Sequence, residues 1–180
     1  MHETSPSLKY AHLERELRFL LPSPPRSLPV ERTRRITDRY LLETGLRLRR
    51  VEEEGRPVVL KLGQKIRVDG GPRAVAHTTM YLGQAEYDTL LVLAADELSK
   101  TRHTVLLGGR HLAVDVFEGR LRGLVTAELD LGADGRPPHE LGLDVLAEVT
   151  GDERFTGGAL ARTSADALAD LLGEHGLHAA

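Results

Sequence analysis

The stretch Leu124–Leu131, with the sequence LVTAELDL, has the most regular alternation of polar and apolar residues in this 180-residue chain. Thr126, Glu128 and Asp130 share one parity, and the residues around them are apolar. Because successive side chains of a β-strand point to opposite faces, the pattern predicts a strand with one charged face and one apolar face. The stretch therefore favours a fold built on a sheet whose two faces differ sharply in polarity.

Seven other stretches are predicted to be strands, and most of the connections between them are too short to hold crossover helices. Turn signals such as Gly70-Gly71-Pro72 and Gly108-Gly109 separate neighbouring strands. Eight strands joined in this way indicate an antiparallel meander. The seven stretches are Tyr10–Leu21, Ile36–Leu42, Leu46–Val51, Val58–Ile66, Ala74–Leu82, Ser99–Leu107 and His111–Glu118.

Two helices are predicted beside the strands. The segment Gln84–Leu93 changes to helical spacing, and a second helix is expected over Ser164–Leu172. Thr163 and Asp166, three residues apart, resemble a capping box at the start of the second helix. Residues 141–149 are expected to be extended or irregular. The predicted fold class is therefore mainly β, of the α+β type.

The composition excludes several classes of protein. The chain has no cysteine, so it has no disulfide framework, thiolate zinc site or cysteine nucleophile. Its net charge of −3 gives no reason to expect nucleic-acid binding. Its apolar runs are shorter than the ~20 residues of a membrane helix, and no signal peptide is evident, so we expect a cytoplasmic protein without membrane contact. Residues 1–9 are predicted to form a flexible tail, and residues 10–176 one domain.

Charged residues recur at one parity of most predicted strands, which permits two interpretations. The charged faces can lie in water, or the sheet can close into a barrel whose lumen they line. A lumen with many charges of both signs would favour a polyanion bridged to the carboxylates by a divalent metal, because unpaired buried charges are costly. The cations are Arg18, Arg47, Arg49, Lys61, Lys100 and Arg102, and the carboxylates are Glu14, Glu16, Asp115, Glu128 and Asp130.

The order of these residues resembles that of the CYTH superfamily, the triphosphate tunnel metalloenzymes. The stretch Glu14–Leu20, ERELRFL, is similar to the Glu-x-Glu-x-Lys signature that opens the family's sequences. Six further landmarks follow in the family's order, so the resemblance covers nearly the whole chain. They are Tyr40-Leu41 followed by Arg47-x-Arg49, Lys61, Lys100–Arg102, Val114–Gly119, Gly123–Asp130 and Glu148–Asp152.

The resemblance implies an eight-stranded antiparallel β-barrel tunnel with a few peripheral helices, which holds a triphosphate group together with Mg²⁺ or Mn²⁺. Characterised members include inorganic triphosphatases, thiamine triphosphatases and class IV adenylate cyclases. By position, the implied catalytic residues are Glu14, Glu16, Arg18, Glu128 and Asp130. The implied phosphate-binding residues are Arg47, Arg49, Lys61, Lys100 and Arg102, and the implied metal ligands are Glu14, Glu16, Asp115, Glu128 and Asp130.

The chain departs from the family's pattern at three places. Arg18 stands where the signature has lysine, and Asp130 stands where the family usually has a second glutamate. The family's fourth strand usually carries an arginine and two glutamates, whereas the matching stretch Ala76–Leu82 offers His77 and Thr79 at the acid positions. Fewer carboxylates predict a metal that is bound more weakly or in a different place.

We therefore expect metal-dependent hydrolysis of a small triphosphate, such as inorganic tripolyphosphate or a nucleoside or thiamine triphosphate, by a monomer or homodimer. One alternative is a non-catalytic module that binds polyphosphate or a nucleotide, which the altered fourth strand favours. Another is cyclisation of ATP to cyclic AMP, although the sequence contains no purine-recognition motif.

Overall fold

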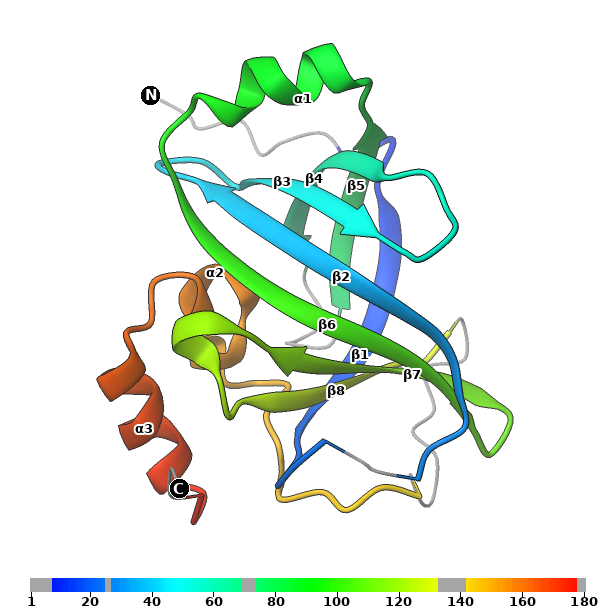
Figure 1. Cartoon of the computed structure of the whole chain (residues 1–180), viewed down its shortest axis with the longest axis vertical. Helices are drawn as coiled ribbons and strands as arrows, with labels where there is room; N and C mark the ends of the chain where they lie inside the picture. Colours follow the sequence, from blue (N-terminus) through cyan, green and yellow to red (C-terminus); the bar gives the residue numbers. More distant parts are fainter. Residues whose placement is uncertain (1–7, 25–26, 69–73, 133–141, 178–180) are drawn as a thin grey trace.

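The computed structural model of the chain describes residues 8–24, 27–68, 74–132 and 142–177, in which the strands form one antiparallel sheet that closes on itself (Figure 1). The strand order is β5-β4-β3-β2-β6-β7-β8-β1, and pairing of β1 with β5 completes the ring. The predicted eight-stranded antiparallel barrel is confirmed. The strands are β1 (His12–Leu20), β2 (Val30–Leu41), β3 (Leu46–Glu52), β4 (Val59–Arg67), β5 (Ala74–Tyr81), β6 (Ala95–Leu107), β7 (Arg110–Phe117), β8 (Val125–Asp130) and the short β9 (Ala147–Glu148).

Strand β1 closes the barrel because it changes partners along its length. Its residues 12–15 pair with β5, and its residues 16–20 pair with β8. Near its end, Phe19 also pairs with Glu148 of β9, which lies within the segment expected to be extended or irregular. The charged residues at the start of β1 therefore lie where this strand changes its partner from β5 to β8.

Two strands begin four or more residues before their predicted starts. Strand β2 begins at Val30, six residues before the predicted start, and β6 begins at Ala95 rather than Ser99. The two strands pair from Val30 opposite Val105 to Leu41 opposite Ala95. Residues 30–35 carry charges on both faces, so their sequence shows no alternation of polar and apolar residues. This part of β2 is extended because its backbone pairs with β6.

In the described ranges, three helices and two 3₁₀ turns lie outside the strands. Helix α1 (Gln84–Leu91) covers the outer face of β3 and β4, where Tyr87 packs with Leu48 and Leu60. Helices α2 (Gly157–Leu160) and α3 (Ala165–Gly173) lie at another side of the barrel (Figure 1), where they enclose an apolar cluster that includes Phe117 and Phe155. The 3₁₀ turns are η1 (Gly119–Leu121) and η2 (Glu153–Phe155).

The capping prediction for the last helix was wrong by one residue. Ser164 is the N-cap of α3, and its hydroxyl accepts a hydrogen bond from the amide of Ala167 at 3.2 Å. The Thr163 hydroxyl instead donates to the Ala159 carbonyl at 3.0 Å. Thr163 thus belongs to the end of α2, a four-residue helix that the sequence pattern did not indicate.

The polarity of the barrel is inverted relative to a small barrel with an apolar interior. Leu17, Phe19, Val114, Ala127 and Leu129 occupy the outward parity of β1, β7 and β8 and are all buried under other segments. The charged parity faces the lumen, so the interpretation with solvated charged faces is wrong. None of the helices in the described ranges has the length and apolar character needed to cross a membrane. The domain limits of 10–176 stay a prediction, and residues 1–7 lie outside the described chain.

Candidate functional site

A cavity of about 800 Å³ is lined by the polar faces of the barrel strands. Its volume lies within the range of small-molecule binding sites, about 300–1,000 Å³. Nine of the eleven predicted site residues line it, and Lys61 and Asp115 do not. The nine residues are Glu14, Glu16, Arg18, Arg47, Arg49, Lys100, Arg102, Glu128 and Asp130.

Asp115 on β7 anchors two cations of the cavity wall from behind. Its buried carboxylate accepts hydrogen bonds from Lys100 Nζ at 2.5 Å and from Arg102 Nε and Nη2 at 2.6 Å. Burial raises the pKa of Asp115, but the charges of Arg102 and Lys100 outweigh this effect and hold it below its usual range. The residue orients the two cations in this structure and is not itself part of the cavity lining.

Glu128 on β8 connects this cluster to β1. Arg102 Nη2 donates to Glu128 Oε2 at 2.6 Å, while Arg18 Nη2 and Nε donate to Oε1 at 3.0 and 3.2 Å. Burial opposes ionisation, but Arg102 and Arg18 keep the pKa of Glu128 well below its usual range. Both carboxylate oxygens therefore hold guanidinium groups.

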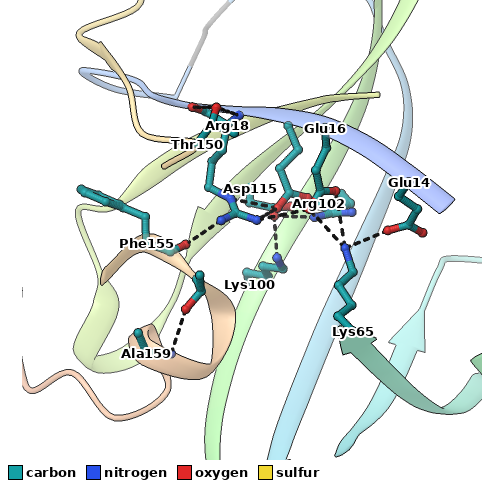
Figure 2. A network of polar contacts seen from close by, with 12 residues as sticks. Glu14, Glu16, Arg18, Lys65, Lys100, Arg102, Asp115, Thr150, Phe155 and Ala159 are labelled. Carbon is teal, nitrogen blue, oxygen red and sulfur yellow. Dashed lines mark hydrogen bonds and ion pairs between the residues drawn. The ribbon is translucent and has the colours of Figure 1, made fainter. Parts of the chain in front are cut away.

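Lys65 on β4 lies between the two carboxylates of β1, as Figure 2 shows. Its Nζ is 2.9 Å from Glu14 Oε2 and lies 3.2 and 3.4 Å from Glu16 Oε1 and Oε2. The opposite oxygen of Glu14 is 2.7 Å from His77 Nδ1, which donates to the ionised carboxylate. Burial raises the pKa of Glu14, but the bonds to His77 and Lys65 lower it to about 2.

The two β5 residues that stand in place of the glutamates implied by the resemblance lie at this corner of the cavity. His77 lines the cavity beside Glu14, and the Thr79 hydroxyl is 3.0 Å from His77 Nε2. The two residues form a hydrogen-bonded chain where the resemblance implied two carboxylates. Lys65 was not predicted as a site residue, although it shares the parity of Lys61 on the same strand and this signal was present.

Asp38 on β2 is a second buried anchor that the sequence did not reveal. It is fully buried and accepts two hydrogen bonds from Arg49, from Nε at 2.6 Å and from Nη2 at 2.7 Å. Burial raises its pKa, but Arg49 and Arg47 lower the pKa of Asp38 to about 2. Asp38 lies on the same face of the strand as Ile36 and Tyr40, so the sequence pattern predicts an apolar face and does not single out this charged residue.

Arg47 on β3 has one buried nitrogen that lacks a hydrogen bond. Its Nε is buried, has no hydrogen-bond partner within the described residues and lies 3.6 Å from Asp38 Oδ1. A buried donor without a partner costs free energy, so the position favours an anionic ligand that would accept this hydrogen bond.

Lys61 and Asp130 have peripheral positions. Lys61 pairs with Arg49 across β3 and β4, but its Nζ lies 4.8 Å from the centre of the Tyr81 ring and outside the cavity wall. Asp130 lies directly opposite Glu16, and its Oδ1 accepts a hydrogen bond from the Gly132 amide at 2.8 Å. The phosphate-binding role of Lys61 stays a prediction that this geometry does not support.

The segment after β9 closes the cavity beside Arg18. The Arg18 amide donates to Thr150 Oγ1 at 3.0 Å, and Arg18 Nη1 donates to the Phe155 carbonyl at 3.1 Å (Figure 2). Helix α2 lies directly against Tyr40, since a Cβ atom added to Gly157 would overlap the Tyr40 hydroxyl. The last landmark of the sequence therefore contributes to the site through Thr150.

The carboxylates suit a divalent cation that arrives with phosphate. Within the described residues, no three Asp, Glu or His side chains are arranged as a ready-made metal centre. Mg²⁺, however, commonly takes one or two protein carboxylates and completes its octahedron with phosphate oxygens and water. Glu14, Glu16 and Asp130 offer hard oxygen donors of this kind on adjacent strands. Glu128 is less suitable, because guanidinium groups hold both its oxygens.

The closed barrel with its charged cavity is the kind of tunnel fold that the resemblance implied. Two solved structures share this fold. The inorganic triphosphatase NE1496 is 22% identical with a TM-score of 0.54, and the match covers 83% of this chain and 95% of that one. A structure described as the hypothetical protein NE1496 is 21% identical with a TM-score of 0.52, and the match covers 84% and 99% of the two chains.

More distant similarity extends to the putative adenylyl cyclase HpAC1 from Hippeastrum, described as having a dominant triphosphatase activity. It is 12% identical with a TM-score of 0.44, and the match covers 67% of this chain and 80% of that one. No protein-family model and no curated protein matches the chain. The similarity to the two NE1496 structures confirms the fold that the resemblance implied.

Proposed function

We propose that this protein is a metal-dependent triphosphatase that binds a small linear triphosphate in its tunnel and hydrolyses a phosphoanhydride bond. The observation that carries the proposal is one cavity in which guanidinium and ammonium groups of β1, β3 and β6 face carboxylates of β1 and β8. A triphosphate needs several fixed cations, and arginine forks match its oxygens in geometry. The shared fold of the inorganic triphosphatase NE1496 supports this substrate class.

The residues would divide the work by position. Arg47 and Arg49 on β3 would hold one part of the phosphate chain, and Lys100 and Arg102 on β6 another part. Arg18 would stabilise negative charge that develops on the transferred phosphoryl group. Asp38 and Asp115 would keep these cations in place, so that little reorganisation is needed when the substrate binds.

Glu14, Glu16 and Asp130 would hold Mg²⁺ or Mn²⁺ together with phosphate oxygens. When bound, the metal would withdraw charge from the phosphate and favour attack by water. The carboxylate of Glu14 is ionised at neutral pH, since its bonds to His77 and Lys65 lower its pKa to about 2.

A binding module without turnover is the second candidate. The specific observation in its favour is that Glu14, Glu16 and Glu128 all have cationic partners, while β5 contributes His77 and Thr79 in place of acids. Such a protein would bind a triphosphate through its cations and lack a free carboxylate for hydrolysis.

A phosphate-release screen with tripolyphosphate, ATP, GTP and thiamine triphosphate, each with Mg²⁺ or Mn²⁺, tests the proposal. We expect orthophosphate from at least one substrate, and loss of release in Glu14→Gln while calorimetry still detects tripolyphosphate binding. The matched control is Glu31→Gln, an exposed position outside the cavity, which should keep full activity. Binding without release by the wild-type protein would identify the binding module instead, and cyclic nucleotide with pyrophosphate would identify a cyclase.

A further inference from the structure

Lys65 is the only ammonium group within the described residues that contacts both carboxylates of the Glu-x-Glu signature. Its Nζ lies within 3.4 Å of three oxygens, one from Glu14 and two from Glu16 (Figure 2). The Lys65 side chain is 34% exposed, and those of Glu14 and Glu16 are 27% and 20% exposed. The contact is therefore partly desolvated and yet open to the cavity.

The two carboxylates need a nearby cation. They lie two residues apart on the same face of β1, so their negative charges repel each other across a partly buried site. Among the residues that the structure describes, the other cation near Glu16 is Arg18, at 3.5 Å, but Arg18 makes shorter bonds to Glu128 at 3.0 and 3.2 Å. Lys65 is thus the main neutralising charge for the pair.

An ammonium group and a divalent cation compete for such a position. Both are attracted by the same oxygens, and two positive centres a few ångströms apart repel each other strongly in a low-dielectric cavity. A phosphate chain would change the balance, because its oxygens offer the lysine a second anionic partner. The flexible four-carbon stem of lysine allows the ammonium group to turn toward that partner.

We propose that Lys65 is the resident counter-cation of Glu14 and Glu16, which keeps divalent metal from binding to the empty tunnel and turns to a phosphate oxygen when a metal–triphosphate complex enters. The turn of Lys65 to a phosphate oxygen rests on the proposed function. The exclusion of metal concerns the protein without substrate and does not depend on that function. Metal and triphosphate should therefore bind together, and metal alone should bind weakly.

Binding of Mn²⁺ alone, without any phosphate, tests the proposal. Electron paramagnetic resonance of free Mn²⁺ and titration calorimetry would measure the affinity of the wild-type protein and of Lys65→Met. We expect weak binding by the wild type and an affinity higher by about tenfold or more in Lys65→Met, within the usual range for coupled sites. Lys65→Gln repeats the charge removal with a polar side chain, and circular dichroism would check that both variants fold.

Two control variants separate the position of the charge from its mere presence. Lys65→Arg keeps a cation at the site and should bind Mn²⁺ as weakly as the wild type. Lys61→Met removes a charge from the same strand and parity, but Lys61 contacts the Tyr81 ring rather than the two carboxylates, so Mn²⁺ affinity should not change.

Equal Mn²⁺ affinities for wild type, Lys65→Met and Lys65→Gln would overturn the proposal, and so would tight Mn²⁺ binding by the wild type itself. These results are independent of turnover. A protein that releases no phosphate from any triphosphate, yet binds Mn²⁺ more tightly after Lys65→Met, would refute the proposed hydrolysis and leave the counter-cation role in place.

Discussion

At the scale of single residues, the cations of the tunnel depend on two buried aspartates outside the resemblance's catalytic set. Asp38 holds Arg49 and lies near Arg47, while Asp115 holds Lys100 and Arg102. A buried ion pair adds little net stability compared with apolar packing, but removal of one partner is costly because the other charge stays buried. These aspartates therefore serve chiefly to fix the geometry of the cations.

Asp38→Asn should destabilise the fold at neutral pH and should change its pH dependence. The folded-state pKa of Asp38, about 2, lies below its ordinary value of 3.8, so its ionisation stabilises the fold above about pH 4 and this contribution is lost as the pH falls toward 2. The lost contribution is about 2 kcal/mol, and the unpaired arginines add a cost of about 3 kcal/mol at neutral pH. Urea denaturation from pH 2 to pH 7 would measure both effects.

The matched control is Asp170→Asn, an exposed position of α3, which should change the free energy of unfolding by less than about 0.5 kcal/mol at any pH. A difference between wild type and Asp38→Asn that stays constant from pH 5 to pH 2 would contradict the assignment of a lowered pKa to Asp38.

At the scale of elements, the short helix α2 is fitted against Tyr40 by two glycines. A Cβ atom on Gly157 would overlap the Tyr40 hydroxyl and lie 2.8 Å from its Cζ, whereas a Cβ atom on Gly158 would lie 3.5 Å from Cδ1. Gly157→Ala should therefore push α2 away from Tyr40 and destabilise the protein by about 1–3 kcal/mol. Thermal and urea denaturation would measure the loss.

Gly158→Ala provides a control of the same chemistry one residue away. Its added methyl group would make an ordinary contact with the ring, and alanine has the higher helix propensity, so we expect no loss of stability and a gain of up to about 1 kcal/mol. Equal destabilisation by the two substitutions would show that α2 does not depend on close approach to Tyr40.

The elements also show how far the sequence predicts this fold. All eight barrel strands were predicted, most of them from alternation, because a strand with one charged and one apolar face leaves a period of two, as in Leu124–Leu131. Alternation missed the first half of β2 and the helix α2, which depend on pairing with β6 and on contact with Tyr40. At the site, parity indicated nine cavity residues, but it could not show that Lys65 lies between carboxylates from another strand.

At the scale of the whole molecule, the barrel buries apolar residues on its outside and charges on its inside. The apolar faces of β1, β7 and β8 and of β3 and β4 are covered by other segments, so two separate apolar clusters stabilise the wall from outside. The lumen, in contrast, contains cations held apart by carboxylates from neighbouring strands. A bound polyanion would reduce the repulsion among these cations, and its binding should therefore stabilise the entire barrel.

Tripolyphosphate should consequently raise the melting temperature when EDTA removes the metal and prevents turnover. At a concentration about 100 times its Kd, the ligand adds about 2.7 kcal/mol, which corresponds to roughly 5–10 °C for a chain of this size. Arg47→Ala removes a cation whose Nε has no hydrogen-bond partner in the described chain, so the Kd of this variant for tripolyphosphate should rise about tenfold. Arg56→Ala, an exposed position in the β3–β4 turn, should keep the wild-type shift.

Differential scanning calorimetry would measure these shifts, with sodium chloride of equal ionic strength as the reference. A wild-type shift no larger than that of the salt would contradict a cationic binding tunnel.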